Sequence, residues 1–174
     1  MASDYLLVIG DREALGWILA EQRTAFPDAR RPEVRRLDVG DRLYIYTTRG
    51  CFKNPGRDRG RIIGRATVAS ITHLLPEPMV FSGREFPIGC DLQIKSLAPF
   101  GEGLDLADLT AELDALSGAP GGHWAFRLRR PLVQLSSADA SLLNERLGPT
   151  VKSRADVLER YVRWYREAPG KSSR

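Results

Sequence analysis

Residues 41–68 place the strongest constraint on the fold of this chain, because they form a strand-like segment, a long polar loop and a second strand-like segment. In 42–48 aliphatic residues face one side and tyrosines the other, which is the period-two pattern of a β-strand. Between this segment and 62–71, the loop at 49–61 is rich in glycine and arginine. A strand, a loop and a strand in succession most simply form an antiparallel hairpin, so we predict neighbouring strands in a curled sheet.

The rest of the chain alternates between short strands and amphipathic helices. The predicted strands are 4–9, 90–97 and 124–135, the last interrupted at Pro131, and the predicted helices are 12–25, 105–117, 138–147 and 154–167. Asp11 and Ser136 or Ser137 are predicted N-caps, and 27–37 and 75–89 are predicted to be irregular. Because the strands are too short and alternating for a doubly wound parallel sheet, we predict a small mixed or antiparallel barrel with flanking helices.

The length of 174 residues limits the chain to a single core. No apolar run approaches the roughly 18 residues that a membrane-spanning helix needs, so no membrane partner is predicted. The N-terminus lacks the basic start of a secretory signal. Two cysteines are also too few for a disulfide framework. We therefore predict a cytoplasmic protein with reduced thiols.

Charge is distributed unevenly along the sequence. Residues 30–65 contain 11 Lys and Arg against 4 Asp and Glu, and residues 152–174 contain 7 against 3. The remaining chain is acidic. Basic segments favour a polyanionic partner, because Lys and Arg that neutralise phosphates release bound counterions. The alternative is a solvated surface that happens to be rich in arginine.

No sequence motif indicates a common catalytic or cofactor chemistry. The glycine-rich fingerprints of P-loop and dinucleotide-binding proteins are absent. Residues of the types that bind zinc lie far apart, without CxxC or HxxxH spacing: Cys51, His73, Cys90 and His123. We therefore predict no metal, no cofactor and no catalytic residue, and expect that the protein is not an enzyme.

The loop at 49–61 is the most informative segment for function. Its cations surround the aromatic ring of Phe52; they are Arg49, Lys53, Arg57, Arg59 and Arg61. Guanidinium groups suit phosphate and aromatic rings suit base stacking, so this interleaving is typical of a nucleic-acid surface. The alternative is a flexible solvated loop with Phe52 folded onto the core. If the basic segments act together, these cations should cluster with Arg160 or Arg163 of the last helix.

Several short motifs follow one another in a recognisable order along most of the chain. They are YLLVIG (5–10), a helix with Trp17, VGDRLYIY (39–46), IGRATV (63–68), and a closing segment from WAF (124–126) through RPL (130–132) and Ser136 to a helix with Leu142, Leu143 and Leu147. In this order they resemble the EVE domain of the PUA-like superfamily, over about residues 4–147. The loop at 49–61 is longer and more basic than the connection in the common pattern.

The resemblance implies an α+β fold, a PUA-like pseudo-β-barrel of curled mixed sheet with flanking helices. Residues 1–150 would form this domain, and 151–174 would add an amphipathic helix and a disordered tail. It also implies binding of RNA or DNA, with a modified base held in an aromatic pocket with a basic rim. With the loop pattern above, the expected ligand-binding residues are Trp17, Tyr46, Thr47, Thr48, Arg49, Phe52 and Trp124, and the expected nucleic-acid-binding cations are Lys53, Arg57, Arg59 and Arg61.

Two other functions fit the sequence. In the first, the protein is an interaction unit whose helix at 154–167 docks on a partner. In the second, it is an enzyme on a small polar or nucleotide-like substrate, with Cys51 as a nucleophile whose pKa is depressed by neighbouring arginines. Trp17 likewise has an alternative role as a core residue of an amphipathic helix.

Overall fold

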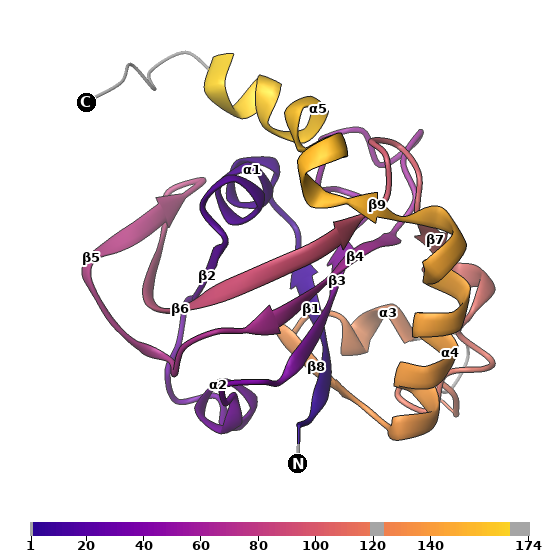
Figure 1. Ribbon diagram of the computed structural model, residues 1–174. Helices are drawn as coiled ribbons and strands as arrows, with labels where there is room; N and C mark the ends of the chain where they lie inside the picture. The colour runs from indigo at the N-terminus through magenta and orange to yellow at the C-terminus, as the bar shows by residue number, and fades with distance from the viewer. Residues whose placement is uncertain (1, 119–123, 168–174) are drawn as a thin grey trace.

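The computed structural model describes residues 2–118 and 124–167 (Figure 1). The strands in this part are β1 (Asp4–Ile9), β2 (Arg23–Phe26), β3 (Arg42–Thr47), β4 (Arg61–Val68), β5 (His73–Phe81), β6 (Arg84–Leu97), β7 (Leu104–Asp105), β8 (Leu132–Leu135) and β9 (Lys152–Ser153). They form one curled mixed sheet with the order β2-β6-β4-β3-β1-β8; β5 and β9 also pair with β6, and β7 pairs with β4. β1 and β3 run parallel, and the other pairings are antiparallel.

Helices cover both faces of the central strands. The α-helices are α1 (Arg12–Glu21), α2 (Pro32–Arg36), α3 (Trp124–Arg127), α4 (Ser137–Leu147) and α5 (Arg154–Glu167), and the short 3₁₀ helices are η1 (Leu106–Asp108) and η3 (Gly148–Thr150). Leu43 and Ile45 of β3 belong to an apolar cluster with α1 and α5. Tyr44 and Tyr46 belong to a second cluster with α4. Successive side chains of a strand point to opposite faces, so the aliphatic residues of β3 are buried in one cluster and its tyrosines in the other.

The predicted hairpin is confirmed. β3 and β4 pair antiparallel from Arg42↔Thr67 to Thr47↔Arg61, with a bulge between Ile45 and Tyr46. Gly64 lies where a Cβ atom would collide with the carbonyl oxygen of Ser96 on β6. The glycine is thus required by the close approach of another backbone, as expected of a glycine inside a strand.

The helix predicted over 12–25 is shorter than expected. Asp11 is its N-cap and accepts a hydrogen bond from the amide of Ala14 at 2.9 Å. The helix ends at Glu21, because Gln22 adopts a left-handed conformation with φ of 51°. The following residues form β2, which pairs with β6, so the prediction of helix there is wrong.

Residues 75–89, predicted to be irregular, instead belong to the long β5–β6 hairpin. Its turn uses Ser82 and Gly83, both with positive φ, as a tight two-residue hairpin turn requires. Pairing is interrupted between Leu74 and Met79. Two prolines lie in this interval, and proline has no N–H to donate. The prolines therefore disturb the ladder locally without preventing the hairpin.

The helix predicted over 105–117 is also wrong, since the segment folds as η1 and successive turns. Its periodic leucines are nevertheless buried as predicted: Leu106, Leu109, Leu113 and Leu116. The buried carboxylate of Asp139 accepts hydrogen bonds from the amides of Asp114, at 2.6 Å, and Ala115, at 3.0 Å. This long-range partner satisfies amides that a continuous helix would have used.

The closing segment differs in part from the prediction. The expected strand pair over 124–135 is a short helix, α3, followed by β8, which pairs with β1. Likewise, 27–37 contains the short helix α2 in what was predicted as an irregular connection. The capped helix after Ser136 is confirmed, because Ser136 and Asp139 form a reciprocal capping box at the start of α4.

The predicted last helix, α5, is confirmed and packs against α1 of its own chain (Figure 1). The guanidinium of Arg154 donates to the carbonyl oxygens of Leu19 and Ala20 at the end of α1. The hydroxyl of Tyr161 donates to the carbonyl oxygen of Ala98 at 2.6 Å. Part of the apolar face of α5 is therefore covered by the same chain, since Tyr161 and Val162 are buried while Val157, Leu158 and Tyr165 are half-buried. The predicted disordered tail, 168–174, lies outside the described residues.

Candidate nucleic-acid interface

A hollow of about 430 Å³ opens where β1 ends and α1 begins. We call it the phenylalanine pocket, because rings from β2, β5 and β6 line it: Phe26, Phe81 and Phe86. Its polar wall residues are Asp11, Thr24, Thr48 and Ser82, and its cationic residues are Arg31, Arg84, Arg129 and Arg130. Its volume lies in the range of about 300–1,000 Å³ that is typical of small-molecule sites.

Packed aromatic residues build one wall of the phenylalanine pocket. The rings of Phe81 and Phe86 meet edge to face with centroids 5.3 Å apart, and Phe86 is half-buried. Trp17 packs on Phe81 with centroids 5.6 Å apart, but is only 5% exposed and is not among the residues that line the pocket. The structure thus places Trp17 in the core as a support for Phe81, where the sequence predicted a stacking face.

Thr24 is an unusual polar residue in this wall. It is 1% exposed, and its hydroxyl has no hydrogen-bond partner among the described residues. Each oxygen of the Asp11 carboxylate, by contrast, already accepts one hydrogen bond, from the amide of Ala14 and from the hydroxyl of Ser82 on the β5–β6 turn. A buried hydroxyl without a partner is costly. Thr24 therefore carries a buried hydroxyl whose hydrogen-bonding capacity is unused among the described residues.

The rim of the phenylalanine pocket is strongly basic. Arg129 and Arg130 are exposed residues between α3 and β8, and Arg84 lies over the ring of Phe86 at 5.8 Å. Asp11 is the one carboxylate among the described lining residues, against four arginines, of which Arg31 pairs at 3.8 Å with Glu33 outside the lining. This excess of positive charge attracts anions to the mouth of the pocket.

A second hollow, of about 580 Å³, adjoins the first. We call it the tryptophan groove; four residues expected from the sequence line it together, namely Tyr46, Thr48, Arg49 and Trp124. The phenylalanine pocket and the tryptophan groove share Thr48 and Leu128, so they form neighbouring parts of one surface. Arg49 is exposed and has no ion-pair partner among the described residues.

Tyr46 forms a buried part of the tryptophan groove. Burial raises the pKa of its hydroxyl to about 12, so the group stays protonated at neutral pH. A Cβ atom on Gly60 would collide with this hydroxyl. Glycine at this position therefore allows the basic loop to close over the tyrosine.

Most of the remaining predicted residues meet in a third hollow of about 300 Å³, which we call the loop pocket. They are Thr47, Phe52, Arg57, Arg59 and Arg61. The ring of Phe52 packs on Phe100, and the guanidinium of Arg160 lies over Phe100 at 5.5 Å. α5 thus brings Arg160 next to the basic loop, as expected if the two basic segments act together. Lys53 lines none of these three hollows.

The arginines of the loop pocket are largely engaged within the chain. Arg57 pairs with Asp58 at 2.7 Å and Arg59 with Asp105 at 2.8 Å. Arg61 donates to the carbonyl oxygen of Gly101 at 2.9 Å. These contacts neutralise part of the charge that the sequence suggested was free for phosphate.

Cys51 lies in an environment that opposes its predicted alternative role as a nucleophile. It is 1% exposed, and burial raises the pKa of its thiol to about 12. The reactive form of cysteine is the thiolate, which this environment disfavours. Residues 2–118 and 124–167 contain no group of three Cys, His, Asp or Glu that could hold a metal ion. His123, considered as a metal ligand, lies outside the described residues.

We expect the free energy of unfolding to fall as the pH rises above about 9. Burial raises the pKa of Cys51, and likewise that of Cys90, from 9.0 to about 12. Between these values the unfolded chain releases thiol protons that the folded chain retains, so folding is progressively disfavoured. The stabilisation is complete below pH 9, and above it the decline approaches about 1.4 kcal/mol per pH unit for each thiol. Urea unfolding from about pH 8 to about pH 10 measures this, and a flat profile would contradict it.

No protein-family model matches the chain, and no curated protein matches its sequence. Solved structures do match it. The protein Rpa0253 from Rhodopseudomonas palustris is 17% identical, with a TM-score of 0.55 over 85% of this chain and 94% of that chain. Human THYN1, solved in complex with DNA containing 5-methylcytosine, is 14% identical, with a TM-score of 0.53 over 83% of this chain and 97% of that chain.

The YTH domain of Mmi1, solved in complex with RNA, has the same general architecture. It is 10% identical to this chain, with a TM-score of 0.53 over 85% of this chain and 79% of the Mmi1 chain. No helix in the described part of this chain is long and apolar enough to cross a lipid bilayer. The curled mixed sheet with flanking helices, matched over most of its length by these structures, identifies the chain as having the PUA-like fold.

Proposed function

We propose that this protein is a nucleic-acid-binding module that takes a single modified base of an RNA or DNA strand into the phenylalanine pocket. The observation that carries the proposal is the wall of that pocket, where an aromatic face lies beside the unpartnered hydroxyl of Thr24 under an arginine rim. A reader of single bases needs these three components: a stacking face, a polar group for the base edge, and cations for the flanking phosphates.

The free energy spent on extruding a base is similar in size to the free energy gained by stacking it in such a site. Extruding a base from a duplex costs a few kcal/mol, and stacking on an aromatic side chain returns about 1–3 kcal/mol per base. Phe86, half-buried and held edge to face by Phe81, is the residue we assign to stacking. The proposal is supported by the fold shared with human THYN1 and the Mmi1 YTH domain, which were solved with methylated DNA and with RNA, respectively.

The tryptophan groove extends the proposed site to the neighbouring nucleotides of the bound RNA or DNA strand. In our proposal Trp124 and Tyr46 contact the nucleotide next to the captured base, Thr48 lies between the two positions, and Arg49 binds a phosphate. Further from the captured base, the nucleic-acid strand contacts Thr47, Phe52 and the cations of the loop. These cations are Lys53, Arg57, Arg59 and Arg61. Trp17 acts through Phe81 and does not touch the base. The proposal includes no bond-making step.

Replacing Phe86 by alanine should weaken binding of a preferred oligonucleotide by about 1–3 kcal/mol, because it removes the stacking face. The slope of log K against log salt should stay the same, since no charge is lost. Fluorescence anisotropy with modified and unmodified single strands at two salt concentrations measures both quantities. Leu74→Ala, at an exposed apolar residue on β5, is the matched control and should bind as the parent protein does. Equal losses in the two variants would contradict the assignment of Phe86.

Thr24→Val separates a binding role from a structural one. The side chains have nearly the same shape, and the hydroxyl that is removed has no partner among the described residues. Stability should therefore be unchanged or slightly increased. Oligonucleotide binding should weaken by about 1 kcal/mol, and discrimination between modified and unmodified bases should decrease. Unchanged binding and discrimination would show that the base edge does not reach Thr24.

A further inference from the structure

A separate hollow of about 460 Å³ lies between α4 and the sheet. We call it the α4 pocket. Asp4 and Arg42 line it at the start of β1 and β3, whereas the phenylalanine pocket and the tryptophan groove lie where these strands end. A six-residue strand spans about 17 Å at about 3.3 Å per residue. The α4 pocket is therefore distinct from the proposed base-binding site.

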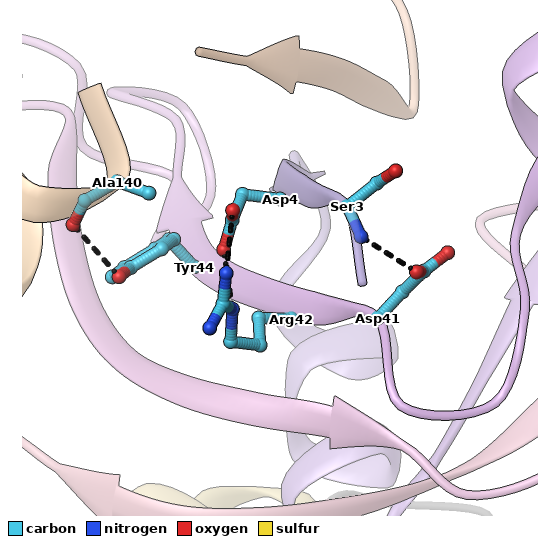
Figure 2. A network of polar contacts seen from close by, with 6 residues as sticks. All are labelled: Ser3, Asp4, Asp41, Arg42, Tyr44 and Ala140. Atoms are coloured by element: carbon cyan, nitrogen blue, oxygen red, sulfur yellow. Dashed lines mark hydrogen bonds and ion pairs between the residues drawn. The ribbon is translucent and has the colours of Figure 1, made fainter. Parts of the chain in front are cut away.

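Three cations from three adjacent strands line the α4 pocket: Arg42 of β3, Arg65 of β4 and Lys95 of β6. Asp4 is the one carboxylate among its described lining residues. It is already held by Arg42 through two hydrogen bonds of 2.7 and 2.9 Å, as Figure 2 shows. This pair leaves Arg65 and Lys95 as the uncompensated charges, since neither has an ion pair with a described residue.

Helix α4 adds uncharged hydrogen-bonding groups on the facing side of the pocket. Ser137, Ser141 and Asn144 are exposed and are spaced by four and three residues, so they share one face of the helix. The hydroxyl of Tyr44 donates to the carbonyl oxygen of Ala140 at 3.0 Å, which ties this face of α4 to β3 (Figure 2). The polar groups of the helix are thereby held opposite the cations of the strands.

We infer that the α4 pocket binds a phosphate monoester. A guanidinium and an ammonium group accompanied by hydroxyl and amide donors are the groups that proteins use to hold phosphate. Two uncompensated positive charges also match a phosphate monoester, which carries a charge of about −1.5 to −2 at neutral pH. The phosphate can come from the end of a nucleic-acid strand or from a small phosphorylated molecule. The inference does not depend on the proposed base-binding function.

Titration with inorganic phosphate, followed by amide resonances in two-dimensional NMR, tests the inference on the full chain. We expect resonances of Ala66 and Ser141 to shift, and Arg65→Gln to weaken phosphate binding about tenfold, the loss expected for a charged hydrogen bond. Lys95→Gln, at an exposed residue, is a second variant and should weaken binding similarly. Arg163→Gln removes the same charge from an exposed residue of α5 and should leave binding unchanged.

Oligonucleotides with and without a 5′-phosphate distinguish the two sources. If a strand end is the ligand, the phosphorylated oligonucleotide binds about tenfold more tightly to the parent protein, and Arg65→Gln removes this difference. If a small molecule is the ligand, the 5′-phosphate has no effect on oligonucleotide binding, while binding of inorganic phosphate still requires Arg65.

The inference is overturned if no resonance near the pocket shifts, or if Arg65→Gln, Lys95→Gln and Arg163→Gln bind phosphate equally. Failure of the base-binding proposal would instead appear in Phe86→Ala, which leaves the α4 pocket intact.

Discussion

Replacing Val162 by aspartate is expected to lower the free energy of unfolding by at least about 4 kcal/mol. Val162 is 0% exposed and lies in the apolar cluster that joins α5 to α1 and the sheet. An aspartate there must either bury an unpaired charge or release α5 from the domain. Release would expose the ring of Tyr161 and break the hydrogen bonds from Arg154 to α1. In either case the loss in free energy of unfolding is a large fraction of the 5–15 kcal/mol that stabilises a typical domain.

Chemical unfolding monitored by circular dichroism measures this loss. Arg163→Asp is the matched control, because the neighbouring residue is exposed and tolerates a change of charge. It should alter stability by less than about 0.5 kcal/mol. A similarly small effect of Val162→Asp would show that α5 is a separable appendage to a domain formed by residues 1–150. A large effect would show that the helix is part of the same cooperative unit.

Asp139→Ala is expected to cost about 3–5 kcal/mol of stability. Its carboxylate is buried, accepts from the amides of Asp114 and Ala115, and caps α4 together with Ser136. Each hydrogen bond to a charged group contributes about 1.5–3 kcal/mol, and removing the acceptor leaves the amides without a partner. The variant therefore destabilises both α4 and the turns that precede it.

Thermal and urea unfolding of Asp139→Ala and Glu145→Ala provide the comparison. Glu145 is an exposed acidic residue on the same helix, and its loss should change stability by less than about 0.5 kcal/mol. Asp139→Asn, which keeps one carbonyl acceptor, should be intermediate. The assigned role of Asp139 is wrong if its replacement by alanine is no more harmful than that of Glu145.

Local patterns in the sequence correctly predicted the elements whose structure depends mainly on neighbouring residues. The alternation in β3 and the order of strand, loop and strand predicted the central hairpin, and Ser136 was one of two predicted caps for the helix that forms α4. The helix predicted over 105–117 failed for a different reason. Its leucine spacing identified the buried side chains, but the carboxylate of Asp139, distant in sequence, holds the segment as turns.

The sequence likewise predicted some residues of the candidate site and missed others. The sequence alone identified the basic loop and a set of residues of which Tyr46, Thr48, Arg49 and Trp124 share one groove. It did not identify the wall of the phenylalanine pocket, because the prolines of β5 obscured the hairpin that carries Phe81 and Phe86. Thr24 was missed as well, since β2 was predicted as helix.

The sequence by itself determined the α+β class, the central hairpin, the two helix N-caps and the basic character of the chain, because these follow from composition and from the local pattern within each segment. Tertiary structure decided which aromatic residues line a cavity and which cations remain uncompensated. Phe81 lines the phenylalanine pocket because β5 pairs with β6. Trp17 packs on the ring of Phe81 from α1 and does not line the pocket. The charge of Arg59 is compensated by an ion pair with Asp105, which the pairing of β7 with β4 brings close to it. Such pairings depend on strand register and helix packing across the whole chain, which no local pattern encodes.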